Sequence, residues 1–112
     1  MKKIEAIIRP EKLETLCSNL EKAGCAGLMI SEIEGHGRQK GVVQQWRGEK
    51  YKIWFLPKIK LETVVKDSEV ERITKIIIDN AKTGEVGDGK IFIYEVKDAI
   101  RIRTGEKGEE AL

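Results

Sequence analysis

The segment with the clearest chemical pattern is Thr83-Gly-Glu-Val-Gly-Asp-Gly-Lys90, in which three glycines precede a lysine. Glycines let main-chain N–H groups approach an anion, and the lysine adds a positive charge. The spacing is close to the phosphate-binding GxxxxGK[ST] motif, but Ile91 stands where that motif needs a hydroxyl for Mg²⁺. We therefore expect an anion-binding turn and no Walker-type hydrolase. The alternative is a plain turn between a helix and a strand.

A second candidate is Arg101-Ile-Arg103. In an extended chain this alternation puts both guanidinium groups on one face, and paired arginine forks suit phosphate oxygens. The alternative is two solvated arginines ahead of an acidic tail. Together with the glycine-rich turn, the pair favours phosphate binding.

The stretch between Gly37 and Lys60 is basic, with seven Lys or Arg residues against the single acid Glu49. It opens with Gly35-His-Gly-Arg-Gln39, in which His36 is interpreted as a loop residue. The segment from Arg47 to Trp54 partly matches the aromatic motif of RNA-recognition domains. Charged residues occupy several of the positions where that motif needs aromatic, small or apolar ones, so a ferredoxin-like RNA-binding module is kept only as the alternative function.

Other chemistry is poorly represented in the sequence. The chain has 1 His and 2 Cys, and it shows no paired carboxylates or nucleophile–base arrangement. It lacks a signal peptide and an apolar stretch of about 18 residues, which predicts a cytoplasmic protein without a membrane span. The net charge of +2 is too small to indicate nucleic acid by itself. We expect a single domain over residues 1–112 that binds anions without catalysis.

The elements that must position these residues follow from hydrophobic periodicity. Alternation predicts strands over 2–9, 28–33, 58–65 and 90–96. Apolar stripes at helical spacing predict one helix from Pro10 to Gly24 and a second that opens on a capping box of Ser68 and Glu71. Between Gly35 and Tyr51 the pattern disappears, which predicts a long functional loop without regular structure.

This order predicts an α+β ferredoxin-like plait: two β-α-β units form a four-stranded antiparallel sheet with both helices on one face. The strand over 90–96 is apolar on both of its faces, with Ile91 and Ile93 on one and Phe92, Tyr94 and Val96 on the other, and the helices cover only one face of the sheet. An exposed apolar face needs a partner. We therefore expect a homo-oligomer.

Taken together, these motifs resemble the PII signal-transduction proteins of the GlnB/GlnK type, over essentially the whole chain. The resemblance is carried by Thr83–Ile93, by the loop entry Gly35–Gly41, by Phe55–Lys58 and by Ile100–Gly105. It implies a homotrimer with ATP or ADP in each cleft between subunits. It also implies that 2-oxoglutarate binds through a Mg²⁺ that the ATP phosphates help to hold.

The resemblance also implies roles for individual residues. Phosphates would be wrapped by the loop over 82–90, and the C-terminal segment 98–112 would reach them from the neighbouring subunit. A T-loop over 37–55 would bind partners, most of all an Amt-type ammonium transporter, with other nitrogen-metabolism enzymes as further targets. The residues implied are, for nucleotide, Met29, Gly37, Arg38, Gln39, Val64, Gly87, Asp88, Gly89, Lys90, Arg101 and Arg103; for 2-oxoglutarate, Gln39 and Lys58; for Mg²⁺, Gln39; for the partner, Arg47; and for modification, Tyr51.

Overall fold

The computed structural model describes residues 1–36, 42–46, 49–53 and 55–112, and over 42–53 it describes the backbone only. The main sheet has four strands, β1 (Lys2–Ile8), β2 (Met29–Gly35), β5 (Leu56–Val65) and β6 (Lys90–Glu95). Their spatial order is β2-β5-β1-β6, and every neighbouring pair is antiparallel. The predicted ferredoxin-like plait is confirmed.

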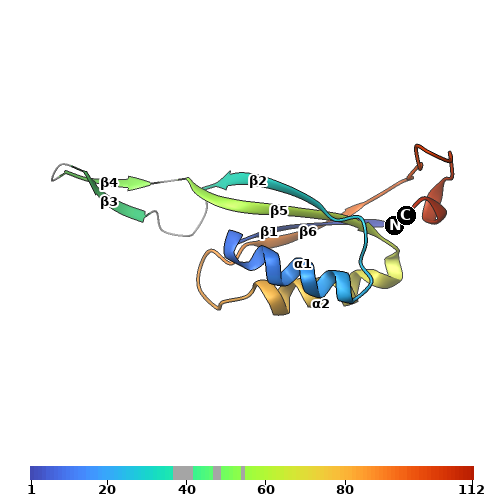
Figure 1. Ribbon diagram of the computed structural model, residues 1–112, viewed down its shortest axis with the longest axis horizontal. Helices are drawn as coiled ribbons and strands as arrows, with labels where there is room; N and C mark the ends of the chain where they lie inside the picture. The colour runs from blue at the N-terminus through green and yellow to red at the C-terminus, as the bar shows by residue number, and fades with distance from the viewer. Residues whose placement is uncertain (37–41, 47–48, 54) are drawn as a thin grey trace.

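The helices α1 (Leu13–Lys22) and α2 (Val70–Ala81) lie side by side under one face of the sheet (Figure 1). The core forms between these two layers because alternate strand residues and one stripe of each helix are apolar. Its buried side chains are Ile4, Ala6, Ile8, Leu16, Leu20, Ile59, Leu61, Ile73, Ile77 and Ala81.

The first helical segment begins and ends close to the predicted positions. Pro10–Lys12 forms a 3₁₀ turn (η1) that leads into α1. At the other end Gly24 has φ +81°, its N–H donates to the Glu21 carbonyl at 3.0 Å, and the Cys25 N–H donates to Leu20 at 2.9 Å. This pair of hydrogen bonds is a Schellman motif, so the predicted glycine stop is confirmed.

The predicted capping box at the second helix is wrong. A 3₁₀ turn, η2 (Asp67–Glu69), precedes α2, and neither element has a side-chain cap hydrogen bond. The Ser68 side chain lies within η2, one residue before the helix N-cap position at Glu69. Because the 3₁₀ turn precedes the helix, α2 begins later than predicted. Ser68 is therefore not the N-cap residue, and its spacing to Glu71 does not form a capping box.

The lack of a hydrophobic pattern after β2 predicted a loop without regular structure. This prediction is wrong, because the segment contains two strands. Strands β3 (Val42–Trp46) and β4 (Glu49–Ile53) pair with each other in a separate two-stranded antiparallel sheet. Figure 1 shows this hairpin extending beyond the end of the main sheet. Main-chain pairing satisfies N–H and C=O groups whatever the side chains are, so the hairpin needs no alternating apolar pattern.

The face of the sheet opposite the helices is mixed in character, not purely apolar. On β6, Phe92 and Tyr94 are each 44% exposed. Beside them, Tyr94 Oη donates to Glu5 at 2.9 Å, and Lys3 Nζ lies 3.1 Å from the Glu62 carboxylate. The predicted exposure of the strand is therefore correct, but ion pairs share the face with the aromatic rings. Among the described residues, no helix is long and apolar enough to cross a membrane.

Candidate functional site

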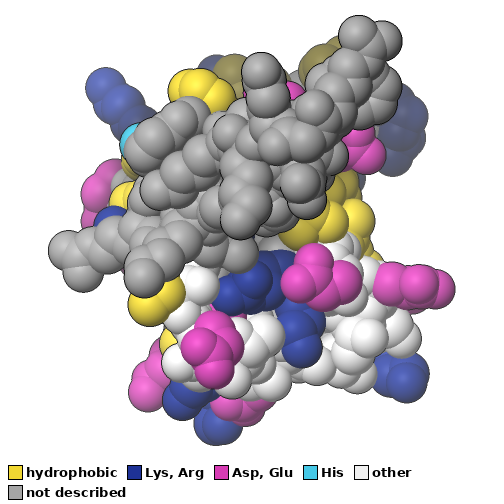
Figure 2. All heavy atoms as spheres, turned by 90° about the vertical axis from the view of Figure 1, so that its left-hand side faces the viewer, with side chains coloured by type: hydrophobic (Ala, Val, Ile, Leu, Met, Phe, Trp, Pro, Cys, Tyr) yellow, Lys and Arg dark blue, Asp and Glu magenta, His cyan; other side chains and the backbone are white. Residues whose placement is uncertain are grey.

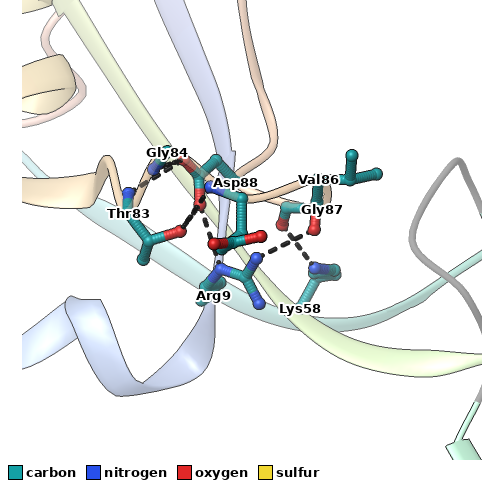
Figure 3. Close-up of polar contacts among 8 residues, drawn as sticks. Arg9, Lys58, Thr83, Gly84, Val86, Gly87 and Asp88 are labelled. Carbon is teal, nitrogen blue, oxygen red and sulfur yellow. Dashed lines mark hydrogen bonds and ion pairs between the residues drawn. The ribbon is translucent and has the colours of Figure 1, made fainter.

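The glycine-rich loop between α2 and β6 is held by the carboxylate of Asp88. One of its oxygens accepts the main-chain N–H groups of Thr83 at 2.8 Å and Gly84 at 2.9 Å. The other accepts the Thr83 hydroxyl and, at 3.1 Å, Nε of Arg9. These hydrogen bonds, that of the Thr83 hydroxyl above all, hold the pKa of Asp88 far below its ordinary value. The loop is thus fixed by an ionised carboxylate (Figure 3).

Two cations from other parts of the chain donate to main-chain carbonyl groups of the loop. Arg9, which follows β1, donates from Nη2 to the Val86 carbonyl at 3.0 Å, and Lys58 on β5 donates from Nζ to the Gly87 carbonyl at 2.8 Å. A trans peptide points its N–H opposite to its C=O. The N–H groups of Gly87 and Asp88 therefore point away from the two cations, as an anion-binding turn requires. Burial, followed by the charge of Arg9, lowers the pKa of Lys58.

The approach of the loop to the sheet requires glycine at position 89. Gly89 has φ +102°, and a Cβ atom added to it would lie 1.7 Å from the main-chain oxygen of Ile7 on β1. Only a residue without a side chain fits there. The close approach of Gly89 to the main chain of Ile7 therefore determines how near the loop lies to the end of β1.

Loop and strands together enclose an open cleft of about 500 Å³. Its walls carry charged groups from Lys58, Glu85, Asp88 and Lys90, with apolar surface from Ile7, Leu56 and Phe92, and His36 also lines it. Figure 2 looks onto this end of the molecule and shows basic side chains beside acidic ones, below the residues drawn in grey. Within the described part of the chain, no cluster of three or more His, Cys, Asp or Glu residues could hold a metal ion.

Comparisons with known proteins identify the family of this chain. The family described as "Nitrogen regulatory protein P-II" matches residues 1–106. The chain belongs to the P-II family.

The P-II chain is 51% identical to "Nitrogen regulatory protein P-II 2" of Methanothermobacter thermautotrophicus, an alignment that spans 100% of this chain and 97% of that protein. It is 52% and 53% identical to the proteins named "Nitrogen regulatory protein P-II" of Haemophilus influenzae and Nostoc punctiforme, with full coverage of both chains in each pair. Membership makes it a nitrogen-regulatory signalling protein and not an enzyme.

The P-II chain brings only some of the implied site residues together. Gly87, Asp88, Gly89, Lys90 and Lys58 meet at the cleft. Met29 and Val64 lie on the open face of the sheet, and Val64 is six residues from Lys58 along β5, or about 20 Å at strand spacing. These two residues do not line the cleft of their own chain.

The expected extended Arg101-Ile-Arg103 segment is a turn instead. The Gly105 N–H donates to the Arg101 carbonyl at 2.7 Å, which closes the turn. The Arg101 guanidinium contacts Glu106 at 2.9 Å and the main-chain oxygen of Glu110 at 3.1 Å, while Arg103 is exposed. Figure 1 places the C-terminal segment at the end of the sheet opposite the glycine-rich loop. Lys90 and the two arginines therefore do not meet within one P-II chain.

The T-loop assignments fall mainly outside the described residues, which omit Gly37, Arg38, Gln39 and Arg47. Tyr51 lies on the backbone of β4 in the P-II chain. The rival RNA motif would need the 47–54 segment on the main sheet as a stacking platform, whereas in the described part of the chain β4 pairs with β3 in a separate sheet. The observed strand pairing therefore does not support the RNA-binding alternative.

Sequence reasoning missed Arg9 and Thr83, which hold Asp88 in place. Thr83 sits five residues before Asp88, a spacing at which one loop can close on a carboxylate. Arg9 carries no comparable signal, because only the antiparallel register of β1 and β6 places it beside the loop of the P-II chain.

Proposed function

We propose that this chain senses adenine nucleotides in its cleft and transmits the outcome to a partner through the segment 37–55. The observation that carries the proposal is the glycine loop over 82–90, whose N–H groups at Gly87 and Asp88 point away from the cations Arg9 and Lys58. Such a loop fits the phosphates of ATP or ADP, and Lys90 adds charge at its end.

A second copy of the chain would complete the site. Met29, Val64, Arg101 and Arg103 lie away from the loop end of the sheet in their own chain. In a homotrimer the adenine-lining and arginine-bearing end of one subunit would meet the loop end of the next. The exposed apolar residues Phe92 and Ile93 support such an assembly.

The 2-oxoglutarate site is proposed at the mouth of the same cleft. The ammonium group of Lys58 would pair with a carboxylate of the ligand. Gln39, next to Gly37 and Arg38, would hold the Mg²⁺, which the carboxamide oxygen of glutamine suits. With Gln39 and the ATP phosphates as its ligands, the Mg²⁺ would supply positive charge for binding 2-oxoglutarate. On the cleft walls, Gly35 lies two residues before the start of segment 37–55 and Lys58 three residues after its end, so ligands there would alter the conformation of the segment.

The partner is proposed to be an Amt-type ammonium transporter, with other nitrogen-metabolism enzymes as further targets and the cytoplasm as the location. Arg47 would enter the transporter when 2-oxoglutarate is low, and Tyr51 would be the modification site if one is used. The basic character of the stretch from Arg38 to Lys60 supports a protein-binding role for it.

Calorimetric titration tests the ligand part of the proposal. ATP and ADP are expected to bind at micromolar concentration, and 2-oxoglutarate only together with ATP and Mg²⁺. The absence of nucleotide binding at high micromolar concentration would refute the proposal. Turnover of ATP well above background would contradict the non-catalytic role.

Co-purification with the transporter tests the partner. Retention is expected with ADP and release with ATP, Mg²⁺ and 2-oxoglutarate, while Arg47→Ala should abolish retention. Lys22→Ala, on an exposed part of α1, is the matched control that should leave retention unchanged. Equal retention under both ligand conditions, or full retention by Arg47→Ala, would show that the segment is not the controlled contact.

A further inference from the structure

His36, the only histidine of the chain, lies on the wall of the cleft. It directly follows β2, and its side chain is exposed at the cleft mouth. The cleft wall at this point also includes Gly35, Leu56 and Lys58. An exposed imidazole at the edge of a charged cleft can contact both the protein and a bound ligand.

Two packing contacts fix the position of this residue. The imidazole ring lies against the ring of Phe55, with centroids 5.6 Å apart and the planes tilted by 50°. The preceding Gly35 packs so closely on β5 that an added Cβ would lie 3.1 Å from Cγ of Lys58. The backbone that carries His36 is therefore held directly against the Lys58 side chain.

The charged groups around the cleft determine how His36 responds to a ligand. Among the described residues, the cations on the walls are Lys58 from β5 and Lys90 from β6, and Arg9 donates to the Val86 carbonyl of the loop. The acids are Asp88, whose two oxygens are already engaged by Thr83, Gly84 and Arg9, and the exposed Glu85. A polyanion bound among these cations would favour a proton on an imidazole at the cleft wall.

We propose that His36 is an anion-binding residue of the cleft that takes up a proton when a phosphate-bearing ligand binds. The inference rests on the proposed nucleotide function and adds a specificity residue to it. Binding of the polyanion and protonation of the imidazole support each other, because each supplies the charge that the other needs. Nucleotide affinity therefore rises as the pH falls through the range in which histidine titrates.

Proton NMR tests this directly, because the single histidine gives one unambiguous set of imidazole signals. The titration curve of these signals is recorded for the full chain alone and with saturating ATP without Mg²⁺. The midpoint is expected to move to higher pH when ATP is bound. An unchanged midpoint would overturn the proposal.

Calorimetry with ATP in buffers of different ionisation enthalpy measures the proton uptake. The nucleotide itself takes up protons in this range, so wild type is compared with His36→Phe, which keeps an aromatic ring against Phe55, and with His36→Gln, which keeps polarity without charge. Between pH 8 and pH 6 wild type is expected to gain about tenfold more affinity than either variant, the factor that one unit of proton coupling gives. At pH 8 the three proteins should bind ATP about equally.

The outcomes separate this inference from the proposed function. If wild type and both variants bind ATP with the same pH profile, the nucleotide function stands and the role of His36 is refuted. If wild type binds no nucleotide at any pH, both proposals are refuted. A loss of binding by His36→Phe at pH 8 as well as pH 6 would show a packing role and would also refute the proton-linked one.

Discussion

The carboxylate of Asp88 ties the glycine-rich loop to Thr83, Gly84 and Arg9, and its pKa lies far below the ordinary value for aspartate. A carboxyl group with a lowered pKa in the folded state stabilises the protein above its unfolded-state pKa. That contribution is lost as the pH falls through the lower, folded-state pKa. The loop and its anion site therefore depend on an ionised Asp88.

Asp88→Asn is expected to lower the unfolding temperature at pH 7, because the amide keeps the shape of the side chain but not its charge. The difference from wild type should shrink below about pH 4, where the unfolded-state carboxylate takes up its proton. Thermal unfolding across this pH range measures it. Glu85→Gln, in the same loop, is the control and should change little. A pH-independent difference would contradict the role of the charge.

Gly89 offers a second test at the level of a single residue. Gly89→Ala adds a Cβ 1.7 Å from the Ile7 oxygen at φ +102°, whereas Gly84→Ala adds one to open space at φ +93°. Both substitutions strain the backbone by roughly 1–3 kcal/mol, but only the first also displaces a strand. Urea unfolding should show a clearly larger loss of stability for Gly89→Ala. Equal losses would mean that the loop does not rest on β1 as described.

Helix α2 begins without a hydrogen bond from a capping side chain. Helix α2 follows the 3₁₀ turn η2 and lacks a side-chain cap, although Ser68 and Glu71 have capping-box spacing. Ser68→Ala is therefore expected to change the free energy of unfolding by less than about 0.5 kcal/mol. A loss near 1 kcal/mol in denaturant unfolding, typical of a true N-cap, would contradict the structure.

In the C-terminal segment, the Arg101 side chain is already bound by residues of the same segment. Arg101 contacts Glu106 and the main chain of the segment that contains η3 (Gly108–Ala111), while Arg103 projects into solvent. If both arginines serve nucleotide binding, Arg101 has to exchange these contacts for phosphate, whereas Arg103 is ready for it. This difference makes Arg103 the better residue for the test of subunit complementation.

On the scale of the whole molecule, the separation of Lys90 from Arg103 predicts complementation between subunits. Each charge would supply hydrogen bonds to phosphate worth roughly 1.5–3 kcal/mol, so Lys90→Ala and Arg103→Ala should each lose about tenfold or more in ATP affinity. If a site combines two subunits, unfolding and refolding the two variants together should restore native affinity at about a quarter of the sites. Calorimetry of the mixture measures this fraction.

Two results would argue against a shared site. Unchanged affinity in both single variants would show that the phosphate cluster is wrongly placed. Weak binding in each variant with no recovery in the mixture would show that both residues act within one chain. Size-exclusion chromatography of each variant provides the control, because neither substitution removes Phe92 or Ile93, two of the exposed apolar residues of β6.

The local sequence was sufficient wherever the determining interactions are local. Alternation in β1, the stripes of α1 and α2, and Gly24 at the helix end predict the four strands and two helices, because apolar periodicity selects the buried face and glycine alone readily adopts positive φ. The glycine spacing before Lys90 also predicts an anion-binding turn, and that binding stays a prediction. The family resemblance drawn from the same motifs agrees with the match over residues 1–106.

Only the tertiary structure placed residues that are far apart in the sequence. Arg9 reaches Asp88, and His36 lines the same cleft as the loop over 82–90, because β1 and β2 end where β5 and β6 begin, at one end of the sheet. The turn at Arg101 and the β3–β4 hairpin were also missed, since main-chain hydrogen bonds stabilise both without a side-chain pattern. Sequence periodicity reports which face of an element is buried, whereas contacts between distant segments follow from strand register, which the fold as a whole determines.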